Sequence, residues 1–96
     1  MPIDADEHFY DRADAHIDLS NAQVSDAGVG KVSASMMYGL SRFNAWVSAR
    51  GFQSAEQMTE ARAETIAYFT AQYQKMLEEN LDDYIEHFDK YMRVDK

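Results

Sequence analysis

Large apolar residues recur every three or four positions between residues 66 and 91 of this 96-residue chain, and the spacing never slips. An α-helix has 3.6 residues per turn, so residues at this spacing share one face. No run of alternating apolar and polar residues, as expected of a strand, interrupts the pattern. The pattern therefore predicts an all-α protein with a long C-terminal amphipathic helix. Its apolar side comprises Ile66, Phe69, Tyr73, Leu77, Leu81, Tyr84, Phe88 and Tyr91.

Two further helical segments are predicted before this one, over residues 6–24 and 31–50. Gly28 and Gly30 separate them, and Gly51 is expected to end the second in a left-handed conformation. Each of the two helices is predicted to bury one face. On the first helix that face comprises Phe9, Tyr10, Ala13, His16, Ile17, Ser20 and Val24, and on the second Val32, Met36, Gly39, Leu40, Phe43, Trp46 and Val47. The third segment is predicted over residues 54–92, with Ser54 and Gln57 spaced as in a capping box. We therefore expect a single domain, residues 1–96, folded as a small three-helix, or possibly four-helix, bundle.

The predicted third helix is too long for one small globule. Thirty-nine helical residues would span roughly 55 to 60 Å, whereas a globule of this size has a radius of gyration of about 12 to 13 Å. The helix could bend near Asn80 and fold back, or its aromatic end could pack on another copy of the chain. Since no glycine or proline marks a kink, we expect Tyr84, Phe88 and Tyr91 to contact a second copy. A homo-oligomer, most simply a dimer, is predicted.

The chain is acidic, with 17 Asp and Glu against 9 Lys and Arg and a net charge of −8. Such a chain repels phosphate backbones and anionic lipids, so no nucleic-acid or membrane partner is expected. Residues 27–54 are the exception, because they contain three bases and no acid. Lys31 and Arg42, with Tyr38 between them, are expected to line one edge of the second helix. That edge either pairs with the acidic flanking helices or binds an anion.

Acidic residues gather on the far side of the third helix. Glu78, Asp82 and Glu86 follow one another at i,i+4 spacing, where like charges repel weakly. This face is expected either to keep the helix soluble or to dock a basic protein partner. The candidate interaction surface predicted from the sequence comprises Tyr84, Phe88, Tyr91, Glu78, Asp82, Glu86, Lys31, Tyr38 and Arg42.

The sequence offers little support for catalysis. The absence of cysteine removes disulfides, thiolate zinc sites, iron–sulfur clusters and thiol nucleophiles. No serine can be paired with a base, so no catalytic residue, cofactor or metal site is predicted. His16 and His87 border apolar stripes and are expected to be packed. The alternative is a small-ligand or metal-binding bundle that uses His8, His16 or His87 with a nearby carboxylate. Asp4 lies four residues before His8, and Asp83 lies four residues before His87.

The compartment expected from the sequence is the cytoplasm. The amino terminus is acidic and lacks the basic region and apolar stretch of a secretory signal. The longest apolar run is the four residues 66–69, whereas a membrane-spanning helix needs about twenty.

Three stretches together resemble a known family: residues 9–14, residues 30–35 through 42–45, and residues 73–85, which read YQKMLEENLDDYI. The chain is similar to small uncharacterised proteobacterial proteins, the domain of unknown function 3144. The resemblance implies an independent, all-helical cytoplasmic domain, and it implies no activity, cofactor or catalytic residue. Together these observations predict a non-catalytic, self-associating helical interaction protein.

Overall fold

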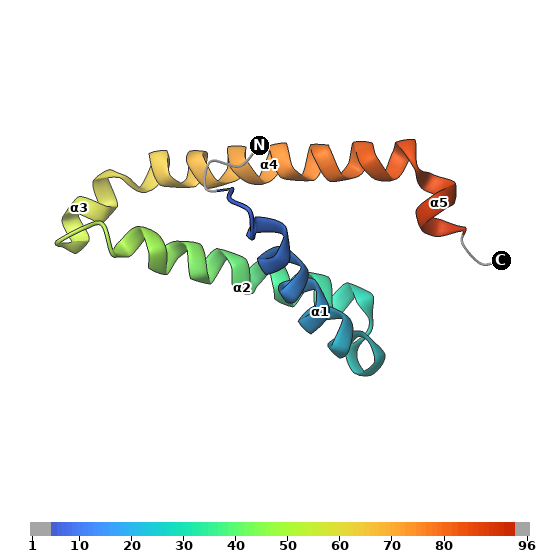
Figure 1. Ribbon diagram of the computed structural model, residues 1–96. Coiled ribbons are helices and arrows are strands. Elements are labelled where there is room, and N and C mark those ends of the chain that lie inside the picture. The colour runs from blue at the N-terminus through green and yellow to red at the C-terminus, as the bar shows by residue number, and fades with distance from the viewer. Residues whose placement is uncertain (1–4, 94–96) are drawn as a thin grey trace. The chain divides into compact units, whose positions relative to one another are not determined.

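The computed structural model describes residues 5–93, which form two units: residues 5–60 and residues 61–93. Every regular element within these residues is a helix, which confirms the all-α prediction (Figure 1). The described residues contain five helices, so the prediction of three long ones in a bundle is wrong. They are α1 (Phe9–Ala27), α2 (Val29–Ala49), α3 (Ala55–Glu60), α4 (Arg62–Glu86) and α5 (Phe88–Met92).

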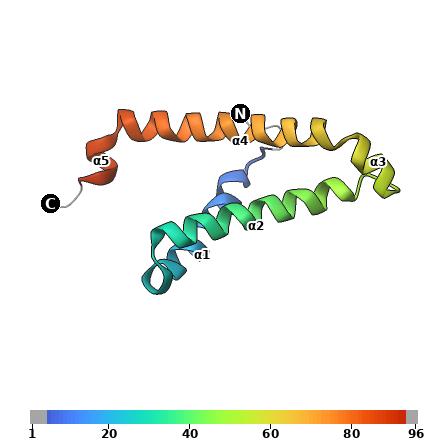
Figure 2. The same cartoon turned by 180° about the vertical axis from the view of Figure 1, so that it is seen from behind.

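In the first unit, α1 and α2 form a helical hairpin whose link is the single residue Gly28 (Figures 1 and 2). The Gly28 amide donates to the carbonyl of Val24 at 2.8 Å, and the Gly28 carbonyl accepts from the amide of Val32 at 3.2 Å. One residue thus ends α1 and begins α2. Its φ of 91° and ψ of 154° lie where a side chain is strongly disfavoured, so glycine is required at this position.

The hairpin has a small interior. Val32 is 6% exposed and is the one buried side chain among residues 5–93. The Ser20 hydroxyl donates to the Met36 sulfur at 3.3 Å and so joins α1 to α2. The half-buried residues of α1 follow a helical spacing and are Phe9, Ala13, Ser20 and Val24. His16 was predicted on the same buried face, but it is exposed.

The first turn of α1 is held by Asp6. Its carboxylate accepts from the His8 amide at 3.2 Å and from the Arg12 guanidinium at 3.0 Å. The hydrogen bond from Arg12 lowers the pKa of the Asp6 carboxyl below its ordinary value. The helix begins at Phe9, slightly later than predicted.

The end of α2 differs from the prediction for Gly51. Gly28 has the one positive φ in the described part of the chain, so Gly51 is not left-handed. The helix closes with tight backbone bonds instead, from Gly51 to Ser48 at 3.0 Å and from Phe52 to Ala49 at 3.1 Å. The capping feature at α3 is confirmed, since the Gln57 amide donates to the Ser54 hydroxyl at 3.1 Å. In a capping box the Gln57 side chain would accept from the backbone amide of Ser54. Here it accepts instead from the backbone amide of the preceding residue, Gln53, at 2.8 Å.

The predicted helix over residues 54–92 is interrupted twice, at Ala61 and at His87. Neither break is at Asn80, where a bend was one of the two predictions. Asn80 lies inside the unbroken helix α4, and its side-chain amide donates to the Met76 carbonyl at 2.9 Å. The 25 residues of α4 span about 37 Å, and α5 leaves the α4 axis after His87 (Figure 1). No helix within residues 5–93 combines the length and apolar character needed to cross a bilayer.

Candidate interaction surface

The apolar side of α4 and α5 is uncovered within its own unit. We call it the α4 stripe: Ile66, Phe69, Tyr73, Leu77, Leu81, Tyr84, Phe88 and Tyr91. Phe69 is half-buried, and the other seven are between 38% and 53% exposed. At about 200 Å² for a large side chain, they expose about 650 Å². That area lies above the roughly 300 to 600 Å² of the largest apolar patch on a typical monomer.

The register of the stripe is that of a straight helix. From Ile66 to Tyr84 its members are separated by three, four, four, four and three residues, an average of 3.6. A spacing of 3.5 would make the stripe drift around the helix and favour a left-handed supercoil. A partner helix can therefore lie along α4 without winding around it.

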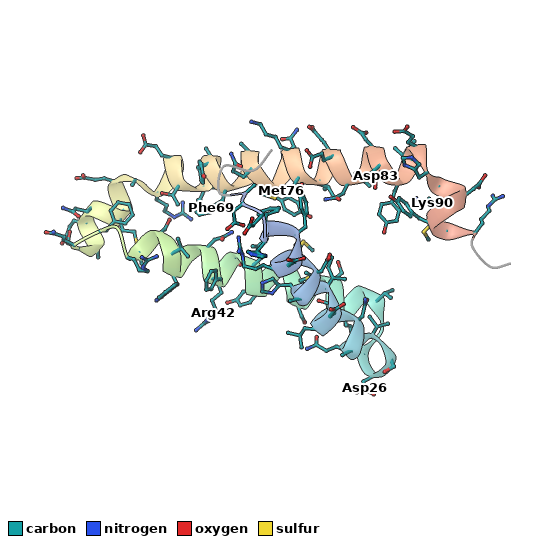
Figure 3. All side chains as sticks on the ribbon, in the orientation of Figure 1. Asp26, Arg42, Phe69, Met76, Asp83 and Lys90 are labelled. Atoms are coloured by element: carbon teal, nitrogen blue, oxygen red, sulfur yellow. The ribbon has the colours of Figure 1, made fainter. Side chains whose placement is uncertain are left out.

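A hydrogen-bonded cluster fixes the break between α4 and α5. The two carboxylate oxygens of Asp83 divide their bonds: Oδ1 lies 3.1 Å from His87 Nδ1, and Oδ2 accepts from the Tyr91 hydroxyl at 2.9 Å. The Tyr91 ring also packs on Tyr84, with ring centroids 4.8 Å apart. The hydrogen bond to Asp83 raises the pKa of the Tyr91 hydroxyl above its ordinary value. Asp83 thus holds α5 and its two stripe residues at a set angle to α4, and Figure 3 shows it near the end of α4.

The three predicted acidic residues, Glu78, Asp82 and Glu86, are exposed. The Glu78 carboxylate accepts a hydrogen bond from the side-chain amide of Gln74 at 2.9 Å. No ion pair to any of the three occurs within residues 5–93. The acidic side of α4 therefore carries negative charge that the described part of the chain does not neutralise.

A second exposed apolar surface lies on α2, where the sequence predicted a buried stripe. We call it the α2 face: Met36, Leu40, Phe43, Trp46 and Val47. Phe43 and Trp46 are 61% and 57% exposed, and their ring centroids lie 5.6 Å apart. The Arg50 guanidinium lies 5.3 Å from the Trp46 ring, within the range of a cation–π contact.

The predicted basic edge borders this face. Lys31, Tyr38 and Arg42 are all exposed, and Arg42 extends outward from α2 in Figure 3. The ion pairs formed by residues 5–93 include neither Lys31 nor Arg42. The predicted pairing of this edge with the acidic helices is thus not formed within the hairpin.

His8 and His87 each contact acidic residues close to them in sequence. Asp4, a predicted partner of His8, lies outside the described residues. His8 is exposed and lies 3.2 Å from Asp11 and 3.3 Å from Glu7, while His87 is half-buried against Asp83 as expected. Within residues 5–93 no group of three or more His, Asp or Glu side chains is placed to hold a metal ion. The metal-binding alternative therefore gains no support from the geometry.

Comparison with known families matches residues 9–85 to one described as "Protein of unknown function (DUF3144)". The chain belongs to the DUF3144 family. The NMR structure of a Shewanella protein, NB7890A, is 39% identical, with a TM-score of 0.77 over 96% of this chain and 98% of that one. Curated proteins provide no significant match. The comparisons confirm the family predicted from the sequence and assign it no activity.

The DUF3144 match includes the whole α2 face and all of the α4 stripe except its C-terminal end. It spans α1 to the last turn of α4, so it contains the α2 face and the stripe up to Tyr84, and it ends before Phe88 and Tyr91. The similarity to the Shewanella structure extends over more of the chain. The predicted site residues thus fall into two sets, a basic edge on α2 and an aromatic and acidic region on α4 and α5.

Two features of this DUF3144 chain were missed by sequence reasoning. The α2 face has the same helical spacing as a buried stripe, so no sequence signal distinguishes the two. The bond between Tyr91 and Asp83 joins residues eight apart across a helix break. It could have been found only if the break at His87 had been predicted.

Proposed function

We propose that this DUF3144 protein is a non-catalytic interaction protein that self-associates through the α4 stripe, with a dimer as the simplest assembly. The observation that supports it is the exposure of the stripe along the whole of α4 and α5. Its area of about 650 Å² approaches the roughly 800 Å² per partner of a standard protein interface. The cytoplasm remains the compartment predicted from the sequence.

Helix energetics support the same proposal. Most helical stability in proteins comes from packing of an amphipathic face rather than from the helix propensity of the segment. Within the described residues of its unit, α4 contacts α5 and has no other helix against it. A second copy would supply the missing packing, and charged residues on the far side would keep the assembly soluble.

The chain offers a matched pair of variants to test this proposal. Tyr73 and Tyr68 lie on the same helix and are both 43% exposed, but Tyr73 is in the stripe and Tyr68 is about 140° away around the helix. In sedimentation equilibrium, Tyr73→Glu is expected to raise the dimer dissociation constant more than about tenfold, since it places a charge in an apolar contact. Tyr68→Glu is expected to change it less than about twofold.

Two results would overturn the proposal. One is a wild-type protein that stays monomeric at every concentration reached. The other is an equal effect of the two substitutions on the dissociation constant, which would place the contact elsewhere. Circular dichroism of both variants checks that each remains helical.

A further inference from the structure

The α2 face also lacks a cover in its own unit. α1 packs against α2 around the buried Val32 and the Ser20–Met36 bond. Phe43 and Trp46, further along α2, stay exposed within the hairpin. At about 200 Å² for a large side chain, the face exposes about 500 Å² beside the 650 Å² of the α4 stripe.

The two surfaces are carried by helices of opposite charge. α2 contains two bases, Lys31 and Arg42, and no acid, whereas α4 contains six acids and two bases. Packing α4 of one copy on α4 of another would bring acidic helices together, and packing α2 on α2 would bring bases together. Packing α2 on α4 brings helices of opposite net charge together around an apolar contact, and such complementarity favours one pairing over others.

We propose that the occupant of the α4 stripe is the α2 face of a second copy, and that the exchange is reciprocal. This inference rests on the proposed self-association and specifies its pairing. Each copy contributes its α2 face to one contact and its α4 stripe to the other, as the two-fold symmetry of a dimer requires. Both apolar surfaces of both copies are covered, with about 1,100 Å² of apolar surface per copy, above the roughly 800 Å² of a standard interface.

The proposal also accounts for the unpaired charges. Lys31 and Arg42 border the α2 face, and Glu78 and Asp82 lie beside and behind the α4 stripe. In the reciprocal dimer the bases of each copy face the acidic helix of the other. The basic partner expected for the acidic side of α4 is then the protein's own α2.

Charge reversal tests this pairing in the full chain. An acidic-α2 variant combines Lys31→Glu with Arg42→Glu, which brings the net charge of α2 from +2 to −2. A basic-α4 variant combines Glu78→Lys, Asp82→Lys and Glu86→Lys, which brings the net charge of α4 from −4 to +2. All five positions are exposed, so each variant is expected to fold. Each alone is expected to raise the dimer dissociation constant about tenfold or more, because like charges then meet in both contacts.

Mixing the two variants gives the decisive measurement. In the mixed dimer one contact joins two reversed helices and the other joins two native ones, so both are complementary again. The dissociation constant is expected to return to within about threefold of the wild-type value. Native mass spectrometry of the mixture should show mixed dimers in large excess over both homodimers.

A matched control separates pairing from net charge. A control variant combines Asp14→Lys, Asp18→Lys and Asp26→Lys, which changes exposed residues of α1 and shifts the net charge from −8 to −2, as the basic-α4 variant does. If net repulsion alone governed association, both variants would dimerise more tightly. The proposal predicts that only the basic-α4 variant is weakened.

The outcomes are distinguishable from failure of the proposed function. A wild-type dimer that is weakened by Tyr73→Glu but unaffected by the acidic-α2 variant would leave self-association standing and overturn this pairing in favour of α4 on α4. Two weakened variants that fail to recover on mixing would also overturn it, since their defects would then lie within each chain.

Discussion

The α1–α2 hairpin and the α4–α5 segment have similar apolar patterns but differ in how much of the apolar surface is buried. The hairpin turns at Gly28 and buries Val32 between its two helices. The other unit carries a longer helix and a longer stripe, yet within residues 61–93 it buries no side chain. The comparison teaches that an amphipathic helix specifies a face to be covered without specifying the chain that covers it.

The two regions also differ in what holds their geometry. The hairpin is fixed by backbone bonds on either side of Gly28, whereas the break between α4 and α5 is fixed by the Asp83 carboxylate. We expect the hairpin to respond to changes in backbone freedom and packing. We expect the α4–α5 break to respond to the ionisation of its side chains.

The largest stability effect is expected at Gly28. Gly28→Ala should lower the free energy of unfolding by roughly 1 to 3 kcal/mol, because its φ of 91° and ψ of 154° strain any residue with a side chain. Gly30→Ala, two residues on within α2, should instead stabilise by up to about 1 kcal/mol. Urea unfolding compares them. Equal effects would show that the hairpin link does not depend on the backbone of Gly28.

A smaller effect is expected in the hairpin interior. Val32→Ala should cost about 1.5 kcal/mol, since it removes two methylene equivalents from a side chain that is 6% exposed. Val29 is 72% exposed on the same helix, and Val29→Ala should change stability by less than about 0.5 kcal/mol. Matching losses in urea unfolding would mean that Val32 contributes no more than a surface residue, and the contrast between the two units would fail.

The smallest effect is expected at Tyr91. Its raised pKa means that the native state keeps the hydroxyl proton to a higher pH than the unfolded chain does. The resulting stability is complete below the ordinary tyrosine pKa and is lost as the pH rises through the raised one. In an ultraviolet titration, Tyr91→Phe should remove the tyrosine that ionises last. Tyr68→Phe should leave that late step in place, and its loss there would contradict the assignment.

Much of the local structure followed from the spacing of apolar residues. The register predicted α1, α2 and α4 because burial of one face gives that spacing whatever covers the face. The helix breaks could not be predicted in the same way, since neither Ala61 nor His87 is a glycine or proline. Glycine identity alone was also misleading. Gly51 was expected to be left-handed, but in the described part of the chain Gly28 is the one residue with a positive φ.

The candidate site was predicted in part. The nine residues predicted to form an interaction surface are exposed. Phe88 and Tyr91 lie on the separate helix α5, whereas one continuous helix was expected. The α2 face was predicted as buried, because its spacing matches that of an interior stripe. Burial depends on which elements meet, and that information is spread over the whole chain rather than held in any one segment.

The one-residue link at Gly28 has a consequence for how the protein can be degraded. Proteases bind several residues of extended chain, and they cut most readily at exposed loops. At Gly28 the residues on both sides are already in helices, and the backbone bonds of the glycine itself are made. Cleavage at this joint must wait until one of the two helices unwinds, so the rate of cutting there reports the opening of the hairpin.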